Sequence, residues 1–312
     1  MRWVTYTSAA AGADRIGLVE DGQLHGLGGH PSMLDLLRDG PDALARAAQA
    51  AKQSPAEVVP VRDAHLRAPV PVPPSIRDFM AFEEHVVTSM RAIGRTIDPG
   101  WYDAPVFYFT NPAAVYGPTD PVPIAPGSDQ FDYELEIAVV IGKEGSDIPV
   151  GQARDHIAGY TILSDWSARD LQEKEMRQGL GPAKGKDTAT TLGPWLVTPD
   201  ECADRRDRDG NLDLTMTASV NGVEYSRGTT ASLHWTFEQI FSYASRGTRL
   251  VPGDVLGSGT VGSGCILELS RVHGGDRYPW LRAGDRVRLE IERLGHIETI
   301  IAPATQPQPQ PL

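Results

Sequence analysis

The sequence predicts a mainly β protein with peripheral helices, of the α+β class. Glycine and proline are frequent, with 32 and 25 of 312 residues, and both favour turns and short strands over long helices. Strand-like apolar runs predominate, and Asn221-Gly222 between two of them is a strong hairpin signal. Hydrophobic residues at 40% and charged residues at 22% are typical of a globular protein. The length allows one large or two ordinary domains.

The first 68 residues are predicted to form a small N-terminal domain, 1–68. Its expected elements are strands at Trp3–Thr7 and Ile16–Glu20, a short helix after Ser32 and an Ala-rich helix over Asp42–Lys52. The run from Ala68 to Pro74 is rich in proline and fits neither a helix nor a central strand. It is predicted to be a stiff connector into a main domain over residues 69–302.

The main domain is predicted to consist of many strands and a few helices. The expected helices cover residues 75–93, 167–172 and 236–247. Ser75 with Asp78 resembles a capping box, and Thr236 with Gln239 can form one. The expected strands are Tyr133–Ile141, Ile157–Leu163, Leu214–Val220, Val223–Ser226, Asp254–Ser258, Ile266–Val272, Arg286–Glu292 and His296–Ile301. The low-complexity end, Pro303–Leu312, is predicted to be disordered.

The charge balance and the cysteine count restrict the classes of partner. With 41 acidic and 29 basic residues, the formal net charge is −12, which argues against nucleic acid or an anionic membrane as the main partner. Two cysteines make neither a disulfide framework nor a structural zinc site. The sequence has no apparent secretory signal and no apolar run long enough to span a membrane, so a cytoplasmic protein is expected.

Two glutamates two residues apart stand in an apolar strand. Side chains alternate along a strand, so Glu134 and Glu136 share one face, which Ala138 and Val140 continue. Adjacent carboxylates in an apolar setting are costly unless a cation neutralises them, and a divalent ion bound through oxygens is a natural cation. The alternative is an edge strand with two solvated glutamates.

A second group follows another apolar strand, in the sequence Ser164-Asp-Trp-Ser-Ala-Arg-Asp-Leu-Gln172. Asp165 stands where the strand ends and a helix begins, so it is either a pocket acid or a helix N-cap. Arg169 and Gln172 are three residues apart and project from the same side of the predicted helix. Together the three side chains can form a polar pocket wall.

Three further groups have both a functional and a structural interpretation. Asp78 and His85 are seven residues apart and would share one face of the predicted helix 75–93, where a histidine is either packed or functional. Lys186 stands in a Gly-rich loop flanked by threonines and is otherwise a solvated lysine. Glu268 is a lone acid in a predicted apolar strand and otherwise faces water. The glycines of 257–262 match GxGxxG, but strand-like residues follow, which excludes a dinucleotide loop.

Taken together and in this order, these motifs resemble the fumarylacetoacetate hydrolase family. The resemblance runs from Asp78 to Glu268, and the Glu-x-Glu strand and the run Asp165–Gln172 are specific to the family. It implies a β-roll catalytic domain, a homodimer and a divalent metal ion. Mg²⁺ or Mn²⁺ is expected, with Ca²⁺ also acceptable to carboxylate ligands.

The resemblance also implies roles for individual residues. The implied metal ligands are Glu134, Glu136, Asp165 and Asp78. The implied catalytic residues are His85 as the base that activates water, Glu268 as the acid that orients it, and Lys186. The implied substrate-binding residues are Arg169, Gln172, Tyr108, Thr260 and Thr190. Thr88 stands where one branch of the family carries an acid three residues after the histidine, so Glu268 is the expected partner of His85.

The expected activity is metal-dependent hydrolysis of a C–C bond in a 1,3-dicarbonyl or acylpyruvate-like 2-oxo acid. In this scheme His85 takes a proton from water, Glu268 stabilises the imidazolium, and Lys186 and Gln172 donate to the oxyanion. The alternatives are a 2-oxo acid decarboxylase, hydratase or isomerase, which stabilise the same enolate. A relative that binds a metabolite without turning it over is a further alternative. The expected partner is a small-molecule keto acid.

Overall fold

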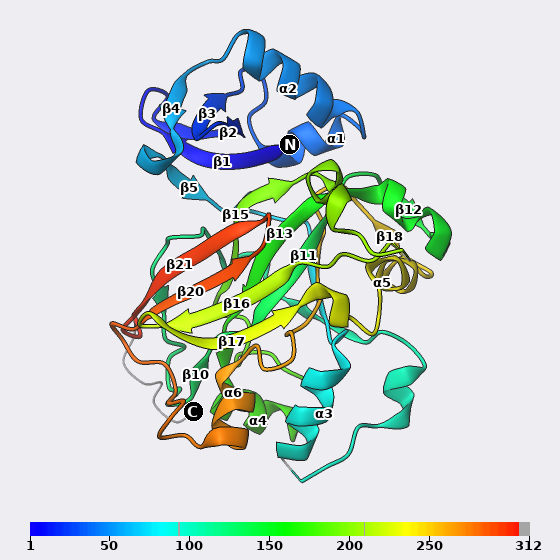
Figure 1. Ribbon diagram of the computed structural model, residues 1–312, viewed down its shortest axis with the longest axis vertical. Helices are drawn as coiled ribbons and strands as arrows, with labels where there is room; N and C mark the ends of the chain where they lie inside the picture. Colours follow the sequence, from blue (N-terminus) through cyan, green and yellow to red (C-terminus); the bar gives the residue numbers. More distant parts are fainter. Residues whose placement is uncertain (93, 209, 306–312) are drawn as a thin grey trace.

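A computed structural model describes residues 1–92, 94–208 and 210–305, and most of its strands belong to two large sheets packed on each other (Figure 1). The smaller sheet crosses in front of the larger one in this view, and short helices lie around them. This arrangement confirms the expected α+β class with mostly β structure. Most of the predicted disordered tail, residues 306–312, lies outside the described residues.

The larger sheet has twelve strands and runs through the N-terminal and the central parts of the chain. In spatial order its strands are β4 (Val58–Pro60), β3 (Gln23–Gly26), β2 (Ala13–Glu20), β1 (Arg2–Ser8), β15 (Thr190–Val197), β13 (Ile157–Asp165), β11 (Leu135–Ile141), β19 (Val255–Gly257), β6 (Ile76–Phe79) and β7 (Phe107–Thr110), with β5 (His65–Arg67) beside β1 and β8 (Val115–Tyr116) beside β15. The central strands β13, β11, β19 and β6 are buried along nearly their whole length.

The smaller sheet covers one face of the larger sheet. Its five strands are, in spatial order, β17 (Val223–Thr229), β16 (Thr215–Val220), β20 (Arg286–Ile291), β21 (Gly295–Ala302) and β9 (Val122–Pro123). Two further strand pairs are β10 (Phe131–Asp132) with β14 (Ser167–Ala168), and β12 (Gly145–Ser146) with β18 (Arg249–Leu250). The predicted hairpin is confirmed, because β16 and β17 pair around Asn221-Gly222.

The side chains of β11 alternate between the two main hydrophobic cores, which lie on opposite sides of the strand. Leu135, Ile137, Val139 and Ile141 pack into the core shared with the smaller sheet. Ala138 and Val140 point to the opposite side, into a core that also contains Trp3 and the N-terminal helices. The predicted alternation is therefore confirmed.

The N-terminal segment extends the larger sheet, since β1 pairs with β15. Its helices are α1 (Met33–Arg38) and α2 (Ala43–Gln53), and the Ser32 hydroxyl caps α1 by accepting from the Asp35 amide. Residues 68–74 contain neither helix nor strand, as their prolines predict. The division into domains at residue 68 stays a prediction.

The helices of the main region are short. They are α3 (Glu83–Ala92), α4 (Arg169–Met176), α5 (Phe237–Ala244) and α6 (Ile266–His273). Thr236 and Gln239 form the predicted capping box of α5. Helices α3, α4 and α6 lie at the end of the molecule opposite the N-terminal strands, and α3 packs on α6 (Figure 1). Among the described residues no helix combines the length and apolar character needed to cross a bilayer.

The predicted helix 75–93 is wrong in its first part. Residues 76–79 form strand β6, which pairs with β19 on one side and β7 on the other, and the helix begins only at Glu83. Ser75 does not cap a helix, because its hydroxyl donates to Asp254 Oδ1 at 2.7 Å. Asp78 and His85 therefore lie on different elements. Pairing with strands distant in sequence overrides the local capping signal.

The predicted strand 266–272 is also wrong, because these residues form α6. The backbone amides of Ile266 and Leu267 donate to the two carboxylate oxygens of Asp132, at 2.7 and 2.9 Å. A carboxylate at a helix N-terminus satisfies amides that have no partner within the helix. The capping residue lies more than 130 positions earlier in the sequence, so no local pattern reports it.

Gly259 tests how tightly the loop after β19 packs on β6. Its φ is +79°, and a Cβ there would lie 2.2 Å from the Phe79 carbonyl oxygen. Gly259→Ala is expected to lower the free energy of unfolding well beyond the left-handed backbone cost of about 1–2 kcal/mol. Gly222→Ala is the control, because its φ is +81° and its Cβ would meet nothing within 4 Å. Urea unfolding of both variants measures the difference, and equal losses would contradict close packing at Gly259.

Candidate active site

Four buried carboxylates converge at one end of the central strands. Asp78 lies on β6, Glu134 directly precedes β11, Glu136 lies on β11, and Asp165 ends β13. One oxygen from each lies within 4.8 Å of the others, and none of the four residues is more than 5% exposed. The sequence placed Glu134 and Glu136 on one face correctly. The solvated alternative for this pair is wrong, because the strand is central and buried.

Gly257 makes room for this convergence. It lies on β19, the strand between β6 and β11, and pairs with Asp78. A Cβ at this position would lie 2.5 Å from Asp78 Oδ1 and 3.0 Å from Glu136 Oε2. A glycine is therefore required where carboxylates from the two flanking strands meet across β19.

Two buried cations hold the carboxylates. Lys186 Nζ donates to Glu134 Oε2 and to Asp165 Oδ2, both at 2.6 Å. Arg169 Nη2 lies 2.7 Å from Glu134 Oε1 and 2.8 Å from Asp132 Oδ2. Lys186 is 3% exposed, so its interpretation as a solvated loop lysine is wrong. Two cations thus pair with three of the five buried carboxylates, Asp132, Glu134 and Asp165, while Asp78 and Glu136 pair with neither.

The pKa values of the acids reflect the excess of carboxylates over cations in this cluster. Burial raises the pKa values of Asp78, Glu136 and Asp165, and for Glu136 the neighbouring Asp78 carboxylate raises it further. Burial alone would also raise the pKa of Glu134, but Lys186 and Arg169 outweigh it and hold that pKa below its usual range. Three of the four acids therefore resist ionisation unless more positive charge enters.

A divalent cation fits this cluster. Asp78 Oδ1, Glu136 Oε1 and Asp165 Oδ1 are buried and accept no hydrogen bond from the described residues. Buried carboxylate oxygens without donors are costly, and coordination to a cation removes that cost. An all-oxygen set suits a hard ion such as Mg²⁺, Mn²⁺ or Ca²⁺ and does not choose among them.

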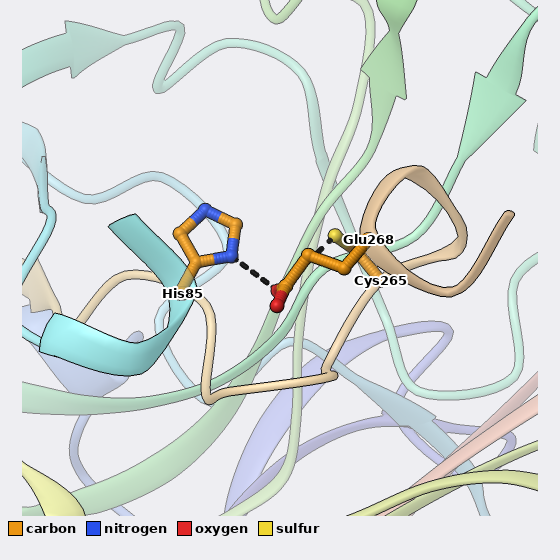
Figure 2. Close-up of side chains that lie close together, drawn as sticks. All are labelled: His85, Cys265 and Glu268. Carbon is orange, nitrogen blue, oxygen red and sulfur yellow. Dashed lines mark hydrogen bonds and ion pairs between the residues drawn. The ribbon is translucent and has the colours of Figure 1, made fainter. Parts of the chain in front are cut away.

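His85 and Glu268 form a second buried group beside the acids. His85 on α3 places its Nδ1 2.5 Å from Glu268 Oε1 on α6, and the thiol of Cys265 lies 3.7 Å from the same oxygen (Figure 2). The backbone amide of Ser263 donates to the other Glu268 oxygen at 3.1 Å. The pairing of His85 with Glu268 that the family resemblance implies is present, although Glu268 lies on a helix and not in the predicted strand.

The backbone connects this group to the carboxylate cluster. Glu134 and Cys265 face each other in an isolated antiparallel bridge. Asp132 adds a second connection, because it caps α6, which carries Glu268, and pairs with Arg169, which holds Glu134. The position of the His85–Glu268 pair is therefore fixed relative to the acids.

The remaining predicted residues lie around the same site. Tyr108 on β7 donates from its hydroxyl to Asp165 Oδ2 at 2.5 Å, and Arg169 Nη1 donates to Gln172 Oε1 at 3.2 Å. Thr190 is the β15 neighbour of Asp165, and Thr260 follows Gly259, whose amide donates to Glu136. All twelve predicted residues thus gather in one region, and their contacts with substrate stay predictions.

Asp132 and Cys265 were not predicted as site residues. Asp132 belongs to the same acidic run as Glu134 and also shares its strand parity, which was the available signal. The spacing of Cys265 and Glu268, three residues apart, becomes meaningful only once 266–273 is a helix. Burial raises the pKa of the Cys265 thiol well above its usual value, so it is a neutral group and not a thiolate nucleophile.

A sequence model described as "Fumarylacetoacetate (FAA) hydrolase C-terminal" matches residues 75–302. The chain belongs to the fumarylacetoacetate hydrolase family. The oxaloacetate tautomerase fahd2, mitochondrial, of Xenopus laevis is 31% identical over 95% of the chain and 89% of its own length. A putative hydrolase of Burkholderia cenocepacia is 37% identical over 61% of the chain. The match spans 63% of the length of that relative.

Solved structures of family members share the fold. A fumarylacetoacetate hydrolase from Exiguobacterium antarcticum superposes with a TM-score of 0.77 at 26% identity, covering 97% of this chain and 99% of its own. A maleylpyruvate hydrolase from Sphingobium, solved with manganese(II) and pyruvate, superposes with a TM-score of 0.72 at 24% identity, covering 98% and 100%. The second similarity concerns the fold alone.

The lack of a side chain at Gly257 should determine how tightly the four-carboxylate cluster binds a cation. Gly257→Ala is expected to weaken Mn²⁺ binding by about 10–100-fold, the range typical of changes to groups that position ligands. The added methyl group would push Asp78 and Glu136 out of position. Isothermal titration with Mn²⁺ measures the change. Gly151→Ala is the control, since its Cβ would meet nothing within 4 Å, and an equal effect there would contradict the argument.

Asp132 should stabilise the fold as well as the site. Asp132→Asn removes one partner of a buried ion pair with Arg169 and is expected to lower the free energy of unfolding by about 3–5 kcal/mol. The exposed pair of Glu224 and Arg227 provides the control, because Glu224→Gln should leave the urea midpoint unchanged. An Asp132→Asn variant as stable as the unsubstituted protein would contradict the role of this ion pair.

Proposed function

We propose that the protein is a metal-dependent hydrolase that cleaves a C–C bond in a 1,3-dicarbonyl or acylpyruvate-like 2-oxo acid. The observation that carries the proposal is the buried His85–Glu268 pair, 2.5 Å apart, beside a cluster of four carboxylates suited to a divalent cation. A histidine–carboxylate pair activates water, and a carboxylate-bound ion binds keto acids.

Asp78, Glu134, Glu136 and Asp165 would hold the ion, with Mg²⁺ or Mn²⁺ as the proposed choice. A bound divalent ion supplies a Lewis acid that polarises a carbonyl and stabilises developing negative charge. Lys186 and Arg169 hold Glu134 ionised and in place. Tyr108 fixes Asp165 through its hydroxyl. These three contacts fix the positions of Glu134 and Asp165 before substrate arrives.

His85 acts as the general base in this proposal. Glu268 accepts from Nδ1–H, which selects the tautomer whose Nε2 has a free lone pair. Nε2 then removes a proton from water as the water attacks the substrate carbonyl. Glu268, fixed by the Ser263 amide, stabilises the imidazolium that results. Protonation of the departing carbon by the imidazolium returns His85 to its starting state.

Two polar groups are suited to the oxyanion. Lys186 directs two of its three N–H bonds to Glu134 and Asp165, which leaves one donor. Gln172 accepts from Arg169 with its oxygen, so its NH₂ group is the end that remains for a substrate oxygen. Donors fixed in advance stabilise charge in a transition state more effectively than mobile water.

A tautomerase or isomerase is the second candidate. It is favoured by the Xenopus relative, which is named an oxaloacetate tautomerase and matches 95% of the chain. The same acids and His85 would serve, with the proton moving to and from carbon in place of water. A decarboxylase, a hydratase or a relative without turnover stays an alternative. The homodimer and the cytoplasmic location expected from the sequence stay predictions.

Product analysis separates these reactions. With Mn²⁺ and a panel of 2,4-diketo acids, hydrolysis consumes water and yields pyruvate with a carboxylic acid. Oxaloacetate given to a decarboxylase yields pyruvate and carbon dioxide, whereas a tautomerase only exchanges its keto and enol forms. Detection of pyruvate and the matching carboxylic acid supports the proposed hydrolase. Keto–enol exchange without cleavage would establish the second candidate.

The general base can be tested directly. His85→Ala should lower kcat by about 10²–10⁴-fold, the usual contribution of a positioned base, while Mn²⁺ affinity is retained. Steady-state kinetics and titration calorimetry measure the two quantities. His273→Ala, at the exposed end of α6, is the matched control and should keep both values. Full activity of His85→Ala would rule out this role for His85.

A further inference from the structure

Cys265 turns the His85–Glu268 pair into a three-ligand cluster. His85, Glu268 and Cys265 each place one ligand atom within 4.8 Å of those of the other two (Figure 2). His85 lies on α3, Glu268 lies on α6, and Cys265 directly precedes α6. Nitrogen, oxygen and sulfur in this combination form a ligand set distinct from the all-oxygen cluster next to it.

The spacing is close to that of a tetrahedral site. Zn²⁺ lies about 2.3 Å from sulfur and about 2.0–2.2 Å from nitrogen or oxygen, so its tetrahedral ligands stand about 3.3–3.6 Å apart. The 3.7 Å between Cys265 Sγ and Glu268 Oε1 already matches this separation. The 2.5 Å between His85 Nδ1 and Glu268 Oε1 must open by somewhat less than 1 Å. His85 is the most exposed of the three, at 9%, against 0% for Cys265 and 2% for Glu268.

The charge of the cluster also suits a divalent ion. A thiol that coordinates a metal gives up its proton, which leaves to solvent, and neutral His85 keeps its single ring proton on Nε2. One thiolate and one carboxylate then balance the two positive charges of the ion. Neutrality matters because Cys265 and Glu268 are 0% and 2% exposed.

We propose that His85, Glu268 and Cys265 form a second metal site, specific for a thiophilic divalent cation such as Zn²⁺ or Cd²⁺. Thiolate and imidazole ligands favour such ions over Mg²⁺ or Ca²⁺. A metal ion at this site replaces the hydrogen bond between His85 and Glu268. His85 then carries its ring proton on Nε2, and that nitrogen is no longer basic. Zinc at this site therefore inhibits the hydrolase, and this consequence alone rests on the proposed function.

Binding can be measured without any substrate. The full-length protein is first saturated with Mn²⁺ to fill the four-carboxylate cluster, and Cd²⁺ is then titrated in. We expect one Cd²⁺ per chain by equilibrium dialysis, with a thiolate-to-metal charge-transfer band in the ultraviolet. Retention of the bound Mn²⁺, followed by its electron paramagnetic resonance signal, shows that the two ions occupy different sites.

Variants assign the site. Cys265→Ser should abolish the band and weaken Cd²⁺ binding by at least about tenfold, whereas Cys202→Ser, at the other buried cysteine, should keep both. His85→Ala provides a second variant, at the most exposed of the three ligands, and should weaken binding while the band remains. A band that persists in Cys265→Ser, or Cd²⁺ that binds without a band and displaces Mn²⁺, would overturn the proposal.

The activity arm separates the two proposals. If Zn²⁺ inhibits the Mn²⁺-loaded enzyme and Cys265→Ser reduces that inhibition by tenfold or more, both the second metal site and the role of His85 are supported. If Cd²⁺ gives the band and the stoichiometry but no diketo acid is cleaved by any preparation, the metal site stands and the proposed hydrolase fails. Equal inhibition of Cys265→Ser and the unsubstituted protein would contradict inhibition through this site.

Discussion

The site depends on charge compensation among buried side chains. Lys186 donates to Glu134 and Asp165, and Arg169 lies between Glu134 and Asp132, so two cations join three carboxylates from two parts of the chain. Burying unpaired carboxylates costs several kcal/mol each, and ion pairs offset this only where their geometry is good. The remaining acids, Asp78 and Glu136, have no such partner. The cluster therefore combines carboxylates that are paired with protein cations and carboxylates that are paired with none among the described residues.

Asp132 extends the same network beyond the carboxylate cluster. Its carboxylate accepts from Arg169 and also from the first amides of α6, which brings Glu268 to His85. A helix N-terminus and a guanidinium are both sources of positive charge, and one carboxylate satisfies both. Asp132 thus joins the sheet that holds the acids to the helix that carries Glu268, in addition to the backbone bridge between Glu134 and Cys265.

Local patterns predicted the parts of the site that depend on one strand. Alternation placed Glu134 and Glu136 on one face, and the end of an apolar run placed Asp165 at the edge of the pocket. Local patterns failed where pairing or capping comes from distant residues. Pairing with β19 and β7 stabilises strand β6, and an N-terminal cap from Asp132 stabilises helix α6. The family resemblance nonetheless identified Asp78 and Glu268, because it does not depend on assigning them to the correct elements.

The glycines of 257–262 have the spacing of a nucleotide-binding motif, but their structural role is different. Their spacing matches a phosphate loop, but Gly257 keeps a Cβ away from Asp78, and Gly259 lets the chain approach β6 with a positive φ. The first requirement comes from the carboxylates and the second from the backbone of residues 79–80, and neither comes from a nucleotide. The spacing of glycines therefore indicates only that the backbone packs closely against a neighbouring group. The structure of the surrounding strands shows which group that is. At Gly257 the neighbours are carboxylates of the acidic cluster, and at Gly259 the neighbour is the backbone that follows Asp78, so both glycines allow close packing next to the cluster.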